Sequence, residues 1–380
     1  MALKKERLLL IVLLVAVSLF FLLERRFLPG VTSKLSPYKS FELLGNVIGL
    51  VKRDYLAEVD PDRTMKGALK GMIDSLDILS SYLDKENVLK YLELKNTRFK
   101  DTGLILSKGY GSFPMVIGVV ENSPAEEKGI QIGDTISTLD SKSTMIMSLV
   151  EASLYLKNKE AKPVKLEVLR GMKTEEVSIE RKLLFEKASS FSQAEGTGGI
   201  LKINHLYPPC VNSIRREILP ALQPSKKALV LDLRNCYEGE IDEGLELINL
   251  FLKADNIGYF EKNRGAKENV SCPKEAALQR MPLAIWVNQA TIGAAEIVAS
   301  VLRDMRQAKI IGVPTLGLVA KQKLFPLEDG SALLLTTSVF RLKSGKKLWE
   351  KGIEPAVKID MKDQSYSNYL EKTLDALSQM

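Results

Sequence analysis

Histidine is nearly missing from this chain, which has only His205 in 380 residues. A serine–histidine–aspartate triad would have to use that one residue, and so would any metal site built on histidine. The zinc motif HExxH needs two histidines and is therefore excluded. The phosphate-binding pattern GxxxxGK(S/T) is absent, and GYG at 109–111 lacks the third glycine of a dinucleotide-binding loop. We therefore expect neither a metal nor an organic cofactor.

Cysteine is also scarce. The three residues Cys210, Cys236 and Cys272 have no CxxC spacing, so they predict no metal site and can form one disulfide at most. Their number leaves the disulfide state and the redox compartment open. A long basic run interleaved with aromatic residues is missing too, so the net charge of +7 does not indicate nucleic-acid binding. A mild attraction to anionic membrane surfaces is the expected consequence.

The longest apolar run lies near the N-terminus, at 8–23, between KKER and ERR. At about 1.5 Å per residue it spans roughly 24 Å of a ~30 Å hydrocarbon core, and flanking Lys and Arg can bridge the difference. We expect an uncleaved signal-anchor at 1–29; a cleaved signal peptide is the alternative, although no A-x-A site follows the run. The charge distribution favours a single-pass protein of the bacterial inner (cytoplasmic) membrane with the bulk of the chain periplasmic or extracytoplasmic.

The rest of the chain is expected to be a multi-domain α/β protein. After a linker at 30–40, apolar residues at helical spacing predict a helical region at 41–96. Residues 97–184 change to a period of two, with short strands such as GLILS, MVIGVV and VKLEVLR and one helix, SLVEASLYLKN. Residues 185–362 alternate strand and helix, which predicts a parallel sheet with crossover helices, and 363–380 predict a tail helix.

The segment NSPAEEKGIQIGDTISTLDSKSTMIMSLVEASLYLK, residues 122–157, closely resembles the PDZ domain of the carboxyl-terminal processing (tail-specific) serine protease family. In PDZ domains an extended peptide adds to a sheet edge as a strand, and backbone N–H groups hold its C-terminal carboxylate. The resemblance therefore implies C-terminal peptide segments of proteins as partners; a structural β-module without a ligand is the alternative. The residues that it implies for peptide binding are Thr102, Gly103, Leu104 and Ile105.

Three further segments carry the same resemblance, which covers about 41–360. They are GALKGMIDSLDILSSYLD at 67–84, LVLDLRNCYEG at 229–239 and a C-terminal signature at 324–357. The resemblance implies that 185–362 form an α/β core of the crotonase-like protease type.

The residues that would form the family's catalytic Ser–Lys dyad are changed. VNQATIGAAEIVA at 287–299 aligns with a family turn that reads approximately VNEGSASASEIVA, which places Gly293 at the nucleophile position. TLGLVAKQ aligns with TFGKGSVQ, which places Leu318 at the general-base position and retains a supporting glutamine as Gln322. Because glycine and leucine supply neither a nucleophile nor a base, the resemblance implies that proteolysis has been lost.

A second site of change is the turn that the family uses near the oxyanion, which reads NNPGG there and NCYEG here. A carboxylate in this turn would oppose the negative charge that develops on the oxyanion. Replacement of the dyad by Thr291 and Lys321 is conceivable, but Lys321 lies at an odd offset from the base position and would face the opposite side of an extended segment. The residues of the turn are Cys236, Tyr237, Glu238 and Gly239.

We therefore expect a membrane-anchored pseudoprotease that binds C-terminal peptide segments or an active relative. One alternative is an active serine-type endopeptidase with a rearranged dyad of Thr291 and Lys321. Another is an oligomeric envelope scaffold that self-associates through the helical region at 41–96. The sequence gives neither the ligand nor the oligomeric state.

Overall fold

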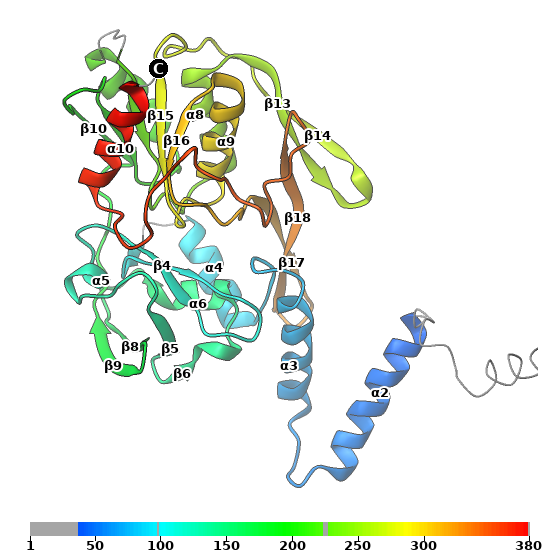
Figure 1. The fold of residues 1–380 in the computed structure, drawn as a ribbon. Helices are drawn as coiled ribbons and strands as arrows, with labels where there is room; N and C mark the ends of the chain where they lie inside the picture. Colours follow the sequence, from blue (N-terminus) through cyan, green and yellow to red (C-terminus); the bar gives the residue numbers. More distant parts are fainter. Residues whose placement is uncertain (1–36, 97–98, 223–226, 379–380) are drawn as a thin grey trace, which may run out of the picture. The chain divides into compact units, whose positions relative to one another are not determined.

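The computed structural model describes residues 37–96, 99–222 and 227–378. The expected signal-anchor at 1–29 lies outside them. Within the described ranges, no helix is both long and apolar enough to cross a membrane. The chain divides into two compact units, Met1–Gly67 and Ala68–Met380 (Figure 1).

The described part of the first unit is helical. Helix α2 spans Pro37–Asp54, and α3, Pro61–Asp74, begins in this unit and ends in the second. Apolar side chains of α2 are exposed, with Leu43 at 58% and Leu50 at 50%. An amphipathic helix of this kind has an apolar face that is free to pack against another surface.

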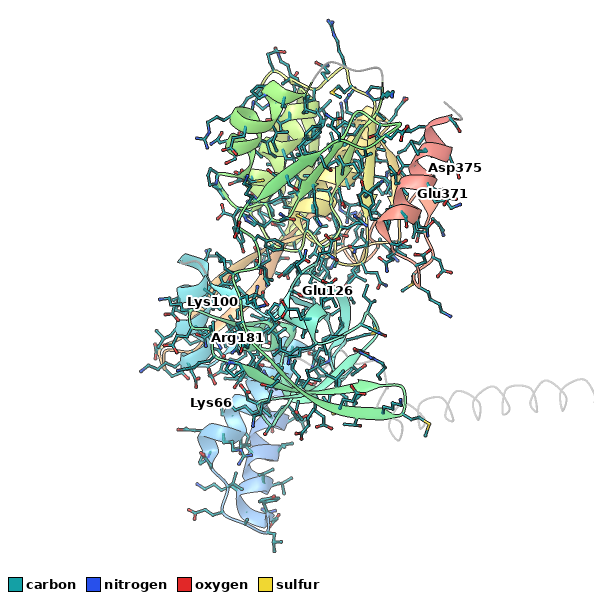
Figure 2. The ribbon with its side chains drawn as sticks, turned by 90° about the vertical axis from the view of Figure 1, so that its left-hand side faces the viewer. Lys66, Lys100, Glu126, Arg181, Glu371 and Asp375 are labelled. Atoms are coloured by element: carbon teal, nitrogen blue, oxygen red, sulfur yellow. The ribbon has the colours of Figure 1, made fainter. Side chains whose placement is uncertain are left out.

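The β-rich module is an antiparallel sheet in the order β3-β4-β5-β8-β9. Helix α6 packs Ala152 and Leu156 into the core of this module and starts with a capping box of Ser148 and Glu151. At the other end of α6, the guanidinium of the buried Arg181 (labelled in Figure 2) donates to the Leu156 carbonyl oxygen. This bond places a cation at the helix C-terminus. The elements are β3 (Leu104–Ser107), β4 (Met115–Val119), α5 (Pro124–Glu127), β5 (Thr135–Leu139), β6 (Lys142–Ser143), α6 (Leu149–Leu156), β8 (Val164–Arg170) and β9 (Lys173–Ile179).

The larger part of the second unit is an α/β core around a sheet in the order β10-β11-β12-β15-β16-β19. Neighbouring strands are parallel, except that β10 is antiparallel to β11. Alternate residues of β12 face opposite layers: Leu229 and Leu231 join the cluster under α8 and α9, whereas Val230 joins Trp286 and Tyr369 under α10. A strand covered on both faces is what its unbroken apolar sequence predicts, so the expected α/β core is confirmed. The elements are β10 (Ser189–Ser192), β11 (Ile200–Ile203), β12 (Leu229–Asp232), α8 (Ile241–Phe251), β15 (Leu283–Val287), α9 (Ala294–Arg306), β16 (Lys309–Gly312), β19 (Val357–Lys358) and α10 (Tyr366–Ser378).

A second sheet of the core, β1-β18-β13-β14 with β17 against β18, includes a strand from the region expected to be helical. Strand β1 (Ser81–Leu83) pairs with residues 332–334 of β18. The helical pattern ends before it because the Asp77 carboxylate accepts hydrogen bonds from the N–H groups of Leu79 and Ser80, a local turn that competes with helix. The remaining elements are α4 (Lys85–Asn96), β2 (Lys100–Asp101), β7 (Lys157–Asn158), α7 (Cys210–Ser213), β13 (Ala254–Lys262), β14 (Lys267–Cys272), β17 (Ala320–Pro326) and β18 (Ala332–Leu342).

Candidate functional site

Gly293, which the resemblance assigns to the nucleophile position, lies at the corner between β15 and α9. Its backbone has φ 62° and ψ −116°, a conformation that residues with a side chain rarely adopt. A Cβ atom placed on Gly293 would have the Leu318 carbonyl oxygen, at 3.8 Å, as its nearest neighbour, so there is room for a side chain. Strained strand-to-helix turns present the nucleophile in other hydrolases. The corner therefore has the form of a nucleophile turn without its hydroxyl.

The fold brings the two changed dyad positions together. The same 3.8 Å separation joins the position of a Gly293 Cβ atom to the backbone of Leu318. Leu318 itself is 6% exposed and offers an apolar side chain where a base would need an amine. The two positions are adjacent in space, but neither side chain can transfer a proton.

Glu296 fixes both positions, a role that the sequence did not reveal because the residue looked only like part of a helix. Its carboxylate accepts hydrogen bonds from the Gly293 N–H at 3.3 Å and the Gly317 N–H at 2.7 Å. The Thr315 hydroxyl and the Leu318 N–H bond to the same carboxylate. Burial raises the pKa of Glu296 to about 7, although these hydrogen bonds favour the ionised form.

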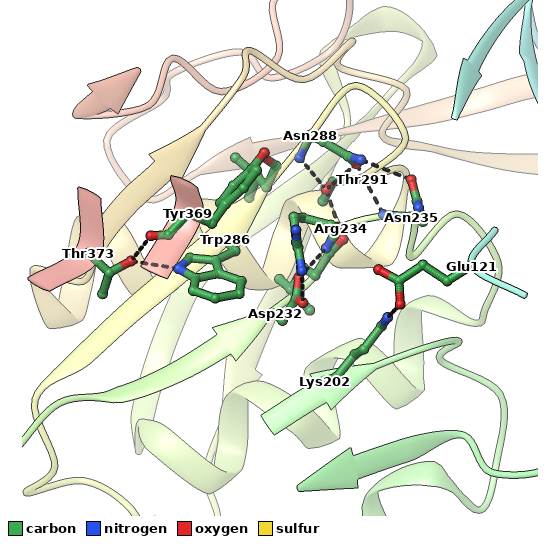
Figure 3. Close-up of polar contacts among 12 residues, drawn as sticks. Glu121, Lys202, Asp232, Arg234, Asn235, Trp286, Asn288, Thr291, Tyr369 and Thr373 are labelled. Carbon is green, nitrogen blue, oxygen red and sulfur yellow. Dashed lines mark hydrogen bonds and ion pairs between the residues drawn. The ribbon is translucent and has the colours of Figure 1, made fainter. Parts of the chain in front are cut away.

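The two residues of a rearranged dyad are engaged elsewhere. Thr291 is fully buried, and its hydroxyl donates to the Leu233 carbonyl oxygen at 2.8 Å (Figure 3). The Lys321 ammonium lies 2.9 Å from the Glu268 carboxylate and 4.0 Å from the centre of the Phe260 ring. Hydrogen bonds from Lys262 and Lys321 lower the pKa of Glu268 to about 2.

Gln322, the retained glutamine, is on β17 and has an exposed side chain. Its amide nitrogen donates to the Leu79 carbonyl oxygen at 2.6 Å. This hydrogen bond connects β17 to the segment before β1, so Gln322 has a structural role there.

The turn after β12 is braced against the nucleophile turn. The Asn235 N–H donates to the Asn288 side-chain oxygen at 3.1 Å, and the Asn288 amide donates back to the Asn235 side-chain oxygen at 2.9 Å (Figure 3). Ile292 N–H donates to the Cys236 carbonyl oxygen at 3.1 Å. Burial raises the pKa of the Cys236 thiol well above its usual value, so this cysteine is an unreactive packing residue.

Tyr237 and Glu238 point to the PDZ-like module. The Tyr237 hydroxyl donates to the Asp101 carboxylate at 3.3 Å, and Glu238 forms an ion pair with Lys157. Burial alone would lower the pKa of Lys157, but the carboxylates of Glu238 and Asp101 outweigh it and raise that pKa. The structure therefore revises the expectation for Glu238, because Lys157 compensates the negative charge that was expected to oppose an oxyanion.

Gly239, the last residue of the turn, is glycine for a steric reason. Its φ is 147°, and a Cβ atom would lie 2.4 Å from the Cβ atom of Leu206. The N–H of Leu206 donates to the Glu238 carbonyl oxygen at 2.9 Å, so this close approach fixes the end of the turn.

The four residues expected to bind a peptide carboxylate form a buried loop at the start of β3. Its N–H groups have internal acceptors: Gly103 donates to the Asp101 carboxylate at 3.1 Å and Leu104 to the Thr102 hydroxyl at 3.4 Å. Strand β3 is an edge strand of the sheet, which is the arrangement that peptide addition requires. Ile105 packs in a cluster with Ala290 of the core.

The module and the core pack tightly beside the nucleophile turn. A Cβ atom on Gly118 would lie 2.7 Å from the Cβ atom of Ala290 and 2.9 Å from the Asn235 side-chain oxygen. The Asn235 amide nitrogen also donates to the Val119 carbonyl oxygen at 3.0 Å. Strand β4 therefore lies directly against both turns of the site.

Tyr237 and Glu238 also line a cavity of about 1080 Å³. Asp101, Phe99, Phe185 and Tyr207 are among its lining residues. The single histidine, His205, also lines it, and its ring lies 5.6 Å from that of Tyr207. A cavity of this size can hold several residues of a peptide.

Nothing in the described ranges suggests a metal centre. No group of three or more His, Cys, Asp or Glu residues is placed there to hold an ion. The three cysteines are separate, buried free thiols.

Comparisons with known proteins agree with this architecture. Residues 199–359 match the model of peptidase family S41, and residues 98–180 match that of a PDZ domain. The chain is 29% identical over 334 residues to the carboxy-terminal processing protease CtpA of Bacillus subtilis (strain 168), covering 87% of this chain and 71% of that protein. It is 30% identical over 332 residues to a probable CtpA-like serine protease of Staphylococcus aureus (strain COL), covering 86% of this chain and 66% of that protein.

Solved structures show the same fold at lower identity. A photosystem II D1 C-terminal processing protease superposes with a TM-score of 0.71 at 20% identity, covering 89% of this chain and 90% of that chain. Mature CPAF in complex with lactacystin superposes with a TM-score of 0.51 at 13% identity, covering 90% of this chain and 92% of that chain.

Proposed function

Because the chain belongs to peptidase family S41 and carries a PDZ domain, we propose that it is a peptide-binding, non-proteolytic member of the carboxyl-terminal processing group. One observation carries the proposal: Gly293 and Leu318, the residues that the resemblance assigns to the nucleophile and base positions, lie side by side. A Ser–Lys mechanism needs a hydroxyl to attack the peptide and an amine to accept its proton. Neither group is present, so bound peptides would be held without being cleaved.

We further propose that the protein is anchored in a bacterial inner membrane with its domains outside the cytoplasm. The apolar run at 8–23 with its charged flanks supports this location. Its partners would be C-terminal peptide segments, an active protease relative or further copies of itself.

The loss of proteolysis is tested with purified protein and an unstructured substrate such as casein. The wild type is expected to produce no fragments, and the double variant Gly293→Ser, Leu318→Lys tests whether the remaining framework still supports cleavage. Cleavage by the wild type that disappears in Thr291→Ala would contradict the proposal and establish the rearranged dyad. Thr144→Ala is the matched control, because it removes a fully buried threonine hydroxyl that lies in the PDZ domain and outside that dyad.

A second function, self-association as a scaffold, is favoured by the exposed apolar face of α2. Leu43 and Leu50 are half or more exposed although they are large and apolar. Light scattering should report an oligomer for the wild type and a smaller species for Leu43→Lys, Leu50→Lys. Arg53 lies in the last turn of the same helix and is already charged in the wild type. Arg53→Lys therefore serves as a control that preserves charge. An unchanged oligomer mass in the double-lysine variant would show that α2 does not take part in self-association.

A further inference from the structure

Helix α2 separates its apolar and polar residues completely over 42–53. At about 100° per residue, these residues divide between two halves of the helix surface. One half, the apolar face, spans about 160° of the circumference and consists of Leu43, Leu44, Val47, Ile48, Leu50 and Val51. The other half, the polar half, consists of Glu42, Gly45, Asn46, Gly49, Lys52 and Arg53. Such a division is typical of a helix that lies at a boundary between an apolar and an aqueous medium.

The apolar face is open to solvent in the structure. Leu44, Val47 and Ile48 are 43%, 46% and 38% exposed, in addition to the exposed residues already named. The apolar surface continues past the end of the helix, because Tyr55 is 65% and Leu56 100% exposed. Single exposed apolar residues are ordinary, whereas a continuous set of this size indicates a surface that something else covers.

Lysines flank the apolar face on both sides. Lys39 lies about 20° beyond Leu50 on one side, and Lys52 lies about 40° beyond Ile48 on the other. Lysines at such a boundary can bury their carbon chains while the ammonium stays among phosphate headgroups. Glu42, the only acid from 39 to 53, lies in the middle of the polar half. A second α2 therefore offers no carboxylate beside its own apolar face over these residues, whereas lipid phosphates suit the flanking lysines.

Asp54 is the one acid within the angular range of the apolar face. It is the last residue of α2, and its carboxylate accepts two hydrogen bonds from the Arg53 guanidinium, at 3.0 and 2.8 Å. A paired carboxylate at the end of the helix can stay in the headgroup region, so it does not oppose burial of the face.

The place of α2 in the chain favours a membrane as the covering surface. Thirteen residues, 24–36, separate the apolar run at 8–23 from Pro37. Fully extended, they reach about 45 Å at most, so an anchor in the membrane keeps α2 near the lipid surface. This tether raises the effective concentration of lipid around α2, so a modest affinity is sufficient.

We propose that α2 lies flat on the membrane surface, with its apolar face among the acyl chains just below the headgroups and its polar half toward water. Only the tether rests on the proposed membrane location, since the apolar face belongs to the described helix itself. A helix of this kind lies on a membrane without crossing it, which agrees with the absence of a possible span in the described ranges. Lipid then covers the face that self-association would use, so the two are alternatives for α2.

Quenching by brominated lipid tests the orientation of α2. The full chain is reconstituted in vesicles of three parts phosphatidylcholine to one part phosphatidylglycerol, with a nitrobenzoxadiazole label on Leu44→Cys or on Asn46→Cys. The two positions lie at nearly the same level of the helix but about 160° apart around it. Brominated phosphatidylcholine should quench the label at position 44 about threefold more strongly than the label at position 46. The native cysteines are buried, and wild type taken through the same labelling gives the background.

The outcomes separate the interfacial helix from the anchor and from self-association. Equal quenching at the two positions would overturn the interfacial helix. A label at position 44 that reports an apolar environment without quenching, and loses that signal when the protein is diluted in lipid, would place a second copy on the face and would overturn it too.

Washing with alkaline carbonate tests the anchor separately. Retention of the chain together with equal quenching would leave the proposed location standing and contradict the interfacial helix. Release of the chain, after quenching that was confined to position 44, would support the interfacial helix and contradict the anchor.

Val47→Asn, Val51→Asn tests the apolar face while nearly preserving helix propensity, because valine and asparagine have similar values. Quenching of the label at position 44 should fall to about half or less, since the middle of the face becomes polar. Gly49→Asn is the matched control: it lies in the polar half, where a Cβ atom has open space, and should leave quenching unchanged. Equal quenching in the double variant and the control would contradict burial of this face in lipid.

Discussion

At the scale of single residues, Gly293 carries most of the meaning of the site. Sequence resemblance placed it at the nucleophile position, and the structure adds its strained backbone and its distance from Leu318. Neither addition could be predicted, because both depend on how β15, α9 and the segment before β17 meet in space. Glu296 was missed for the same reason: its hydrogen bonds reach residues about twenty positions along the chain.

Gly293→Ala should lower the free energy of unfolding by about 1–3 kcal/mol, because alanine is strained at this φ and ψ although there is space for it. Urea denaturation measures the loss. Gly345→Ala is the control, since Gly345 has a φ of 83° and open space around it, and should lose about 1 kcal/mol. A Gly293→Ala variant as stable as the wild type would show that the turn is not strained.

Glu296 should make stability depend on pH. Its pKa is raised from 4.5 to about 7 in the folded state, so between these values the folded protein binds more protons than the unfolded chain. The free energy of unfolding should therefore fall as pH rises from 4.5 to 7, by roughly 3 kcal/mol from this residue. Glu296→Gln cannot titrate, so the difference between wild type and variant should change across that window. A difference that stays constant from pH 4.5 to 7.5 would contradict the assignment.

At the scale of helices and strands, the alternation of strand and helix was sufficient to predict the α/β core. The unbroken apolar run of β12 predicted burial on both faces. The structure confirms this, because Leu229 and Leu231 pack into one core cluster and Val230 into another. The place of β1 could not be predicted, because it pairs with a strand about 250 residues away and nothing in SYL specifies that partner. Helix α10 was expected only as a tail helix, yet its Tyr369 and Thr373 are fully buried against the sheet.

Tyr369→Phe tests the attachment of α10. The Tyr369 hydroxyl donates to the Val287 carbonyl oxygen at 2.8 Å, at the end of the strand that leads to the nucleophile turn. Its removal leaves a buried carbonyl oxygen without this donor and should lower the free energy of unfolding by about 1–3 kcal/mol. Tyr366→Phe removes a hydroxyl from a residue that is 47% exposed and should change stability by less than about 0.5 kcal/mol. Equal losses in the two variants would mean that the buried bond adds no stability.

At the scale of the whole molecule, the presence of a PDZ domain was predictable from residues 122–157, and its contacts with the core were not. Lys157 and Glu238 lie 81 positions apart and look like ordinary surface residues in the sequence. Their pairing depends on the way β4 lies against the turns at Asn235 and Ala290. Specificity of this kind belongs to tertiary packing, which a pattern of apolar residues does not encode.

The fit between β4 and the core can be tested by exchanging side-chain volume. Gly118→Ala places a methyl group 2.7 Å from the Cβ atom of Ala290, and should lower the free energy of unfolding by about 1–3 kcal/mol. Adding Ala290→Gly removes that contact and should restore part of the loss. Denaturation of the single and double variants measures both, and strictly additive effects would show that the two surfaces are not in contact.

The central claim is that this member of peptidase family S41 has no working nucleophile. Cleavage assays depend on choosing a good substrate, whereas a hydroxyl-directed acylating probe reacts with any activated serine or threonine. The decisive measurement is the intact mass of the protein after incubation with such a probe, beside trypsin as a positive control. No added mass is expected on the wild type under conditions that label trypsin completely. A stoichiometric adduct on a hydroxyl such as that of Thr291, abolished by Lys321→Ala, would contradict it.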